Sequence, residues 1–262
     1  MRDLPVIRAS LADSYAAMEA LGANLSSEEW DAQSLCPDWT VRGVVTHVVS
    51  IEAMLISWLP DSPDAPPPFD RAGAFVQETA GLGAGAFMER VHDVLARRRQ
   101  DLTTLGPSDL ARPSWTPVGP GTYGRFMEIR IFDLWVHERD ITTPLKRPTD
   151  DTGVRAEIAL AEVEGSLGYI VGKKVGLPDG KSMVFHLGGP LARDLAVVVD
   201  GRAAVVPGVA EPDVEVWTDT VTFVQLACGR IDPQVPIDAG IIRWSGDPEL
   251  GERAARNLRF TM

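Results

Sequence analysis

Apolar residues recur at intervals of three and four through the first part of the chain, which is the spacing of amphipathic helices. The segments with this pattern lie roughly at residues 8–25, 40–59, 71–105 and 122–141. The third segment is interrupted near residues 81–85, and stretches rich in proline and glycine at 60–69 and 106–121 predict long connections. The pattern therefore predicts an antiparallel four-helix bundle.

The pattern changes near residue 150. After one more helical segment at 154–171, apolar residues form short strand-like runs at 183–187, 195–199, 203–206, 214–218 and 237–244. Asp200-Gly201 between two of these runs predicts a tight hairpin. Helical patterns at 219–228 and 248–260, the latter capped by Asp247, lie among the strands. The chain is thus predicted to be a two-domain α+β protein, with a bundle at 1–148 and an α+β domain with an antiparallel sheet at 149–262.

The last helix of the predicted bundle is apolar almost all the way round, which is typical of a helix buried on most sides. One row along it is nevertheless polar and carries Arg130, Asp133, His137 and Asp140 at steps of three and four. Helical spacing places these four side chains on a single face. Because charged side chains are rarely buried unless they are paired or hold a metal, this row is the first candidate for a functional site.

Asp133 and His137 are four residues apart and can offer one oxygen and one nitrogen to a common point. His47, inside the helical segment 40–59, could complete the set from a facing helix. Two histidines and one carboxylate with an open position are typical of catalytic zinc, although ferrous iron or nickel fits the same ligands. The alternative is that His47 and His137 are core histidines and that Asp133 pairs with Arg130. The spacing does not decide between them.

The remaining members of the row also have two interpretations each. Arg130 either binds a substrate carboxylate in a bidentate manner or neutralises Asp133 or Asp140. Asp140 either orients His137 or pairs with a neighbouring arginine, Arg139 or Arg42.

Other polar residues give weaker signals. His92 is predicted to lie at the surface, and His186, in a strand, to be structural. Cys36 is predicted to be structural because no base lies near it in the sequence. The run Arg97-Arg98-Arg99 is predicted to be a solvated basic end near a helix C-terminus.

Composition limits the classes of partner. Of 262 residues, 45% are hydrophobic and 24% are charged, as in ordinary globular proteins. The formal net charge of −12 argues against nucleic acid and against anionic membrane surfaces as partners. The two cysteines stand far apart, the N-terminus lacks a signal-peptide core, and no run approaches the length of a spanning helix. We therefore expect a cytoplasmic protein that is a monomer or a homodimer.

Two motifs resemble those of a known family. They are C-P-D-W-T-V-R at 36–42 with His47 five residues on, and F-D-L-W-V-H-E-R-D-I at 132–141. Together they resemble the mycothiol-dependent maleylpyruvate isomerase family, whose N-terminal domain is a DinB-like metal-binding four-helix bundle. The segments 218–230 and 243–260, with the turn S-G-D-P at 245–248, resemble the sterol-carrier-like C-terminal domain of that family.

The resemblance implies a zinc ion on His47, Asp133 and His137, with aspartate where the isomerase has glutamate. The shorter arm would place the metal closer to the helix at 122–141. The resemblance further implies mycothiol as a thiol cosubstrate, which would isomerise or S-conjugate a small electrophile such as a maleylpyruvate-like acid. A C-terminal arginine, Arg230 or Arg243, is implied at the active site. We therefore predict Arg130 and Arg230 as catalytic residues.

Two other functions are compatible with the same residues. One is a non-catalytic protein that binds a small molecule, and the other is a metal hydrolase that needs no thiol. The sequence does not identify the substrate, the metal or the oligomeric state.

Overall fold

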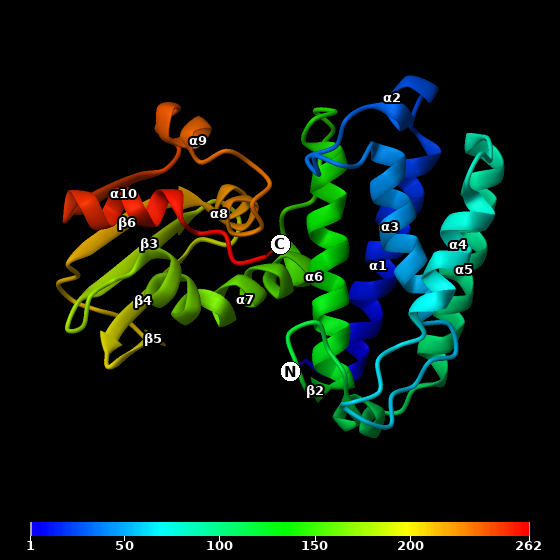
Figure 1. The fold of residues 1–262 in the computed structure, drawn as a ribbon, viewed down its shortest axis with the longest axis horizontal. Helices are drawn as coiled ribbons and strands as arrows, with labels where there is room; N and C mark the ends of the chain where they lie inside the picture. Colours follow the sequence, from blue (N-terminus) through cyan, green and yellow to red (C-terminus); the bar gives the residue numbers. More distant parts are fainter. Residues whose placement is uncertain (1, 262) are drawn as a thin grey trace. The chain divides into compact units, whose positions relative to one another are not determined.

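The computed structural model describes residues 2–261. It forms two compact units, divided between Thr149 and Asp150. The first unit is helical and the second combines helices with a sheet, so the predicted two-domain α+β class is confirmed (Figure 1).

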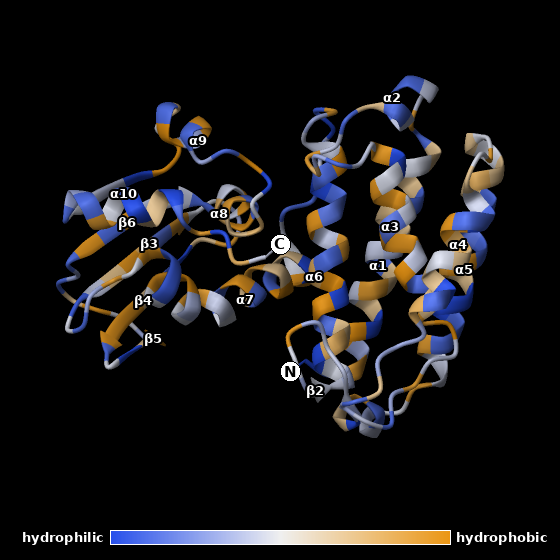
Figure 2. Ribbon diagram, viewed as in Figure 1, coloured by the Kyte–Doolittle hydropathy of each residue, from blue (hydrophilic) through white to orange (hydrophobic). Residues whose placement is uncertain are grey.

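Four long helices build the first unit: α1 (Leu4–Ala23), α3 (Val41–Met54), α5 (Ala84–Thr104) and α6 (Tyr123–Thr142). Helix α1 packs against α5 and α6, and α3 packs against the same two helices, so the four close into a ring. Both hydrophobic and hydrophilic residues occur along α6 (Figure 2). The bundle therefore has one shared core, into which α6 brings its polar row.

Shorter elements fill the connections of this unit: α2 (Ser27–Asp31), α4 (Phe69–Thr79), the 3₁₀ helix η1 (Pro107–Ala111), β1 (Pro113–Ser114) and β2 (Gly121–Thr122). Helices α4 and α5 divide the predicted third segment at its expected break. Strands β1 and β2 pair as an antiparallel ladder, so the connection 106–121 contains more structure than its composition indicates.

Two helix ends differ from the prediction for identifiable reasons. Helix α1 begins at Leu4 because the side chain of Asp3 accepts a hydrogen bond from Val6 N–H and Pro5 suits the first turn. Helix α3 ends at Met54 because the chain turns at Ser57, which has a φ of +56°. The Ser57 N–H donates to the Asp101 carboxylate at 2.7 Å, a contact that local patterns cannot show.

The second unit is built on a five-stranded sheet in the order β5-β4-β3-β6-β7. Its strands are β3 (Ser182–Gly188), β4 (Arg193–Asp200), β5 (Arg202–Val206), β6 (Val214–Asp219) and β7 (Arg243–Gly246). The predicted hairpin at Asp200-Gly201 joins β4 to β5, with Gly201 at a φ of +63°.

This sheet is mixed, whereas the sequence predicts an antiparallel one. Three pairings are antiparallel, but β3 and β6 run parallel. Strand β5 ends at Val206, which lies opposite Ala196, and Ala196 lies opposite Val184. Strand β6 starts beside Met183, the residue before Val184. The end of β5 and the start of β6 therefore lie near the same end of β3. The connecting segment crosses the sheet without returning along it, and so β6 runs parallel to β3.

Four helices belong to this unit: α7 (Gly153–Tyr169), α8 (Thr220–Ala227), α9 (Gln234–Asp238) and α10 (Pro248–Arg256), with a π-helical turn η2 (Ile170–Val175) after α7. Asp247 caps α10 as predicted. The predicted strand at 237–244 starts too early: helix α9 occupies its beginning, Gly240 turns the chain at a φ of +66°, and β7 begins only at Arg243. Among residues 2–261, no helix is long and apolar enough to cross a membrane.

Candidate metal centre

The polar row lies on α6, and the cap of this helix fixes where it starts. The hydroxyl of Thr122 accepts a hydrogen bond from the backbone N–H of Arg125 at 3.2 Å. From there Arg130, Asp133 and His137 follow at helical steps. The row is therefore set by the register of a single capped helix.

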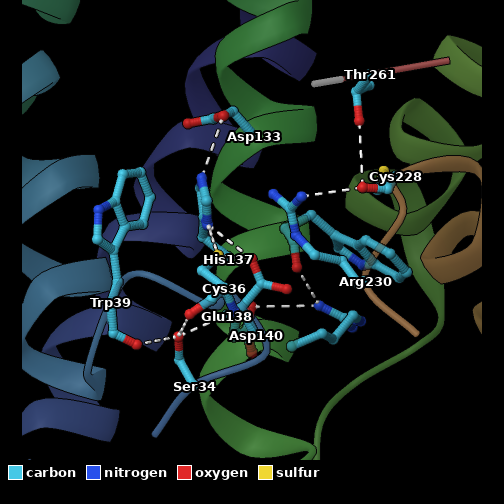
Figure 3. A network of polar contacts seen from close by, with 12 residues as sticks. Ser34, Cys36, Trp39, Asp133, His137, Glu138, Asp140, Cys228, Arg230 and Thr261 are labelled. Atoms are coloured by element: carbon cyan, nitrogen blue, oxygen red, sulfur yellow. Dashed lines mark hydrogen bonds and ion pairs between the residues drawn. The ribbon is translucent and has the colours of Figure 1, made fainter. Parts of the chain in front are cut away.

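The segment before α3 is tied to the other end of this row. Thr40 caps α3 by accepting a hydrogen bond from the N–H three residues on, at 3.2 Å. Leu35 N–H donates to the carbonyl oxygen of Asp140 at 2.9 Å. These contacts bring Cys36 and Trp39 beside His137 (Figure 3).

Three donor groups converge between α3 and α6. His47, Asp133 and His137 each offer one ligand atom, and these atoms lie within 4.8 Å of one another. Asp133 Oδ1 is 3.5 Å from His137 Nε2, and the two imidazole ring centroids are 4.9 Å apart. Two ligands of one tetrahedral zinc ion stand about 3.4 Å apart. The residues present therefore fit a divalent metal of the zinc type.

Asp140 supports His137 from the other side of the ring. Its Oδ2 lies 2.8 Å from His137 Nδ1, and its side chain is almost fully buried (Figure 3). When Nδ1 carries the proton of this hydrogen bond, Nε2 faces Asp133 with a free lone pair, as a metal ligand requires. This contact supports the interpretation that Asp140 orients His137.

Cys36 also meets this end of the row. Its Sγ lies 3.2 Å from Asp140 Oδ2 and 4.0 Å from His137 Nδ1, and all three residues are buried. No base lies near Cys36 in the sequence, but the fold brings the Asp140 carboxylate to it across 104 positions. The thiol is a further contact of the carboxylate that orients His137.

Arg130 holds the remaining oxygen of the aspartate ligand. Its Nη1 donates to Asp133 Oδ2 at 2.7 Å, while Oδ1 faces His137. Its Nε and Nη2 both donate to Glu52 Oε1, at 3.1 and 3.0 Å. Arg130 is 4% exposed, so the interpretation that it neutralises Asp133 is the one these contacts show. A part in substrate binding stays a prediction.

Glu52 is the centre of a buried polar cluster. Its Oε2 accepts hydrogen bonds from Tyr15 Oη at 2.5 Å and from Arg98 Nε at 3.0 Å. Arg98 is only 2% exposed, so the prediction of a solvated arginine run is wrong at this position. Sequence reasoning missed this cluster, although one signal was available: Glu52 is an acidic residue inside an otherwise apolar helical segment.

The charges around the ligands shift their proton affinities. Burial acts to raise the pKa of Asp133, but the positive charges of His137 and Arg130 outweigh it and hold this pKa far below its usual value. Burial acts to lower the pKa of His137, but Asp133 and the hydrogen bonds of the site outweigh it and raise this pKa well above its usual value. Surroundings that favour a proton on His137 also favour a divalent cation between the same groups.

His47 is positioned by an aromatic neighbour. Its ring stacks on Trp39, with centroids 4.6 Å apart and planes at 30°. Each of the three candidate ligands thus has a supporting group: Trp39 for His47, Arg130 for Asp133 and Asp140 for His137. Such outer partners are typical of metal sites whose ligands are held in one orientation.

The other predicted residues belong to other parts of the chain. Arg230 belongs to the second unit, where its Nη1 donates to the Cys228 carbonyl oxygen at 2.9 Å (Figure 3). Arg243, also in the second unit, lies over the ring of Trp217 at 5.0 Å. His92 is exposed, as predicted, and binds Glu19.

Comparisons with known proteins agree with the motifs. The family model of the mycothiol maleylpyruvate isomerase N-terminal domain matches residues 11–142, and that of the C-terminal domain of the same proteins matches 157–253. Two crystal structures, of the mycothiol-dependent maleylpyruvate isomerase and of a variant with one histidine replaced by alanine, are similar to this chain. Each matches with a TM-score of 0.60 and 16% identity over 93% of both chains, which shows a shared fold. No curated protein matches the chain.

Proposed function

Because this chain belongs to the mycothiol maleylpyruvate isomerase family, we propose that it is a metal-dependent enzyme that uses a low-molecular-weight thiol, mycothiol, as cosubstrate. Its substrate is a small electrophile of the maleylpyruvate type, which the enzyme isomerises or S-conjugates. The metal is a divalent ion, with zinc favoured by the two nitrogen donors and one oxygen donor.

One observation carries this proposal. Within the region that the N-terminal family model matches, His47, Asp133 and His137 place their donor atoms within 4.8 Å of one another. Three protein ligands leave at least one coordination position for an exogenous ligand, as catalytic rather than structural zinc sites do.

The residues of the chain do three things in this scheme. His47, Asp133 and His137 hold the ion, which when bound would lower the pKa of a thiol at its open position so that the thiolate exists at neutral pH. Asp140 fixes His137 through Nδ1, and Arg130 fixes Asp133 through Oδ2. These contacts keep Nε2 of His137 and Oδ1 of Asp133 directed at the same point.

The thiolate of the cosubstrate adds to the conjugated double bond of the electrophile. In an isomerase, rotation about the resulting single bond and elimination of the thiol follow, and the cosubstrate is regenerated. In an S-transferase, the adduct takes up a proton and is released. We place a carboxylate of the substrate on Arg230 or Arg243, because a guanidinium binds a carboxylate in a bidentate manner.

The test combines metal content with thiol binding. Purified protein is expected to hold about one divalent ion per chain, and calorimetry is expected to detect mycothiol binding. His47→Ala should lose both, because the ion loses a ligand and the thiol loses the ion. Wild-type protein without a stoichiometric ion contradicts the proposal, and so does turnover that needs no added thiol, which indicates a hydrolase. Metal and thiol binding without turnover of any electrophile indicate a binding protein instead.

A further inference from the structure

The carboxylate of Glu52 has every acceptor position in use. Its Oε1 receives Nε and Nη2 of Arg130, and its Oε2 receives Tyr15 Oη and Arg98 Nε. An ionised carboxylate has about four lone-pair positions, so four donors occupy them all. The donors come from α1, α5 and α6 and Glu52 from α3, so all four bundle helices meet at one side chain.

Arg130 is the link from this cluster to the candidate metal centre. Two of its nitrogens bind Glu52, and Nη2 also lies 3.4 Å from the Val48 carbonyl oxygen. The third nitrogen, Nη1, donates to Asp133 Oδ2. Because a guanidinium is planar and rigid, fixing two of its nitrogens fixes the direction of the third.

The orientation of Asp133 needs this support more than the orientations of Arg130 and Glu52 do. Its side chain is 28% exposed, against 5% for Arg130 and 1% for Glu52. A carboxylate in contact with water can rotate and exchange its two oxygens. With Oδ2 held by Arg130, only Oδ1 faces His137, so the aspartate is set to offer a single oxygen.

Charge balance gives a second reason why Glu52 matters to the ion. Glu52 carries one negative charge of the cluster that contains Arg98 and Arg130. Its loss makes the surroundings of Arg130 more positive by one charge, beside a site for a divalent cation.

We propose that Glu52 is a positioning residue for the metal ligand Asp133 and that it acts through Arg130. The inference rests on the proposed metal site. It adds to that site a residue that does not bind the ion but holds Arg130, which in turn binds the ligand Asp133. A cluster that only stabilises the bundle would affect unfolding but not the affinity of the folded protein for metal.

Two variants separate these roles. Glu52→Gln keeps the shape of the side chain and removes its charge. Glu19→Gln is the matched control, because Glu19 is also a carboxylate of the bundle that binds an arginine of α5, Arg99, at 3.1 Å. Circular dichroism first establishes that each variant is folded at the temperature of the binding measurement.

Zinc affinity is measured by calorimetry with a competing chelator, and cobalt(II) absorption reports the coordination geometry. Glu52→Gln is expected to weaken zinc binding by about 10- to 100-fold, the range for outer partners of metal ligands. It is also expected to change the visible bands of bound cobalt, whereas Glu19→Gln should leave affinity and bands as in the wild type. Equal affinity in the wild type and Glu52→Gln overturns the inference, and so does an equal loss in both variants.

A double variant covers the case in which Glu52→Gln does not fold. Glu52→Gln with Arg98→Met removes one charge of each sign, and replacing both partners of a buried ion pair is far milder than removing one. Arg130 then keeps its contact with Asp133 but faces a neutral amide in place of the Glu52 carboxylate, so zinc affinity is still expected to fall by about 10-fold or more. Unchanged affinity in this variant overturns the inference. If the wild type itself binds no zinc, the proposed metal site is contradicted together with the inference that rests on it. If the wild type binds zinc and the variants bind it equally well, only the inference is contradicted.

Discussion

Two histidines of this chain lie between two carboxylates, yet only one of them belongs to a convergent group of metal donors among residues 2–261. His137 lies 2.8 Å from Asp140 and 3.5 Å from Asp133. His186, on β3, lies 2.8 Å from Asp194 and 3.2 Å from Glu215. By distance to acidic partners alone, the two sites are nearly equivalent.

The two sites differ in the number of metal donors that converge and in how far the acidic side chains are buried. At His137, a second imidazole from the facing helix α3 reaches the side occupied by Asp133. At His186, the partners are cross-strand neighbours on β4 and β6, and their side chains are 67% and 35% exposed. A sheet register spreads side chains along a surface, whereas two packed helices direct them at one point. A histidine between two acids is therefore not sufficient for a metal site, and a converging donor is needed.

The largest expected effect separates the two histidines directly. His137→Ala should lower zinc affinity by more than about 100-fold, beyond the range for outer partners, because a direct ligand is lost. His186→Ala should leave the metal content of the purified protein unchanged. Elemental analysis and calorimetry on both variants check this, and an equal loss in the two would remove the distinction between the sites.

The second prediction compares the acids that bind Nδ1 of each histidine. Asp140→Asn should weaken zinc binding by about 10- to 100-fold, because a neutral amide stabilises the orientation and tautomer of His137 less than a carboxylate does. Asp194→Asn makes the same chemical change at His186 and should have no effect on zinc. Calorimetry with a competing chelator measures both, and a wild-type affinity in Asp140→Asn would show that Asp140 does not act through His137.

The third prediction concerns acid. Burial acts to raise the pKa of Glu52, but Arg130 and Arg98 outweigh it, so this pKa lies below its ordinary value of 4.5. Glu52 therefore contributes stability that is present above pH 4.5 and is lost as the pH falls through its lower folded-state pKa. One such group changes the stability by at most about 1.4 kcal/mol per pH unit.

Glu52→Gln should accordingly flatten the fall of stability below pH 4.5, as measured by denaturant unfolding at a series of pH values. Asp213, in the same domain as His186, provides the comparison with Glu52. The hydrogen bond from Lys181 lowers its pKa, but the pair is open to solvent, which screens it. Asp213→Asn should change the acid slope less than Glu52→Gln does, and the opposite order would show that burial does not distinguish the two regions.

The sequence predicts those parts of the site that depend on local spacing. Asp133 and His137 are four residues apart on one helix, so their common face follows from helical geometry. The capped start of α10 is likewise local, because Asp247 lies next to the turn that it closes. His47 could be proposed as a third ligand, but only the packing of α3 against α6 brings it to the other two.

The rest depends on contacts between distant positions. Arg98 looks solvated in its run of three arginines, and its partner Glu52 lies 46 positions away. Cys36 looks isolated because Asp140 follows it by 104 positions. The parallel pairing of β3 with β6 is also non-local, since it depends on where β5 ends. Local sequence patterns cannot identify such partners, because these patterns involve only neighbouring positions.

The smallest expected effect concerns the aromatic ring beside each site. Trp39 stacks on His47 at 4.6 Å, and Trp217 stacks on His186 at 5.1 Å with planes at 19°. Such pairs contribute about 0.5–1.5 kcal/mol, so Trp39→Leu should weaken zinc binding by roughly 2- to 10-fold. The imidazole remains but samples more orientations, so the loss should appear as faster zinc dissociation. Trp217→Leu removes an equivalent stack and should leave zinc binding unchanged, as stopped-flow dissociation into a chelator can show.

Because Trp39 adjoins the cap of α3, unfolding of both variants should be measured alongside. A loss in Trp39→Leu explained entirely by partial unfolding would mean that convergence of the donors, without the stacked ring, is enough.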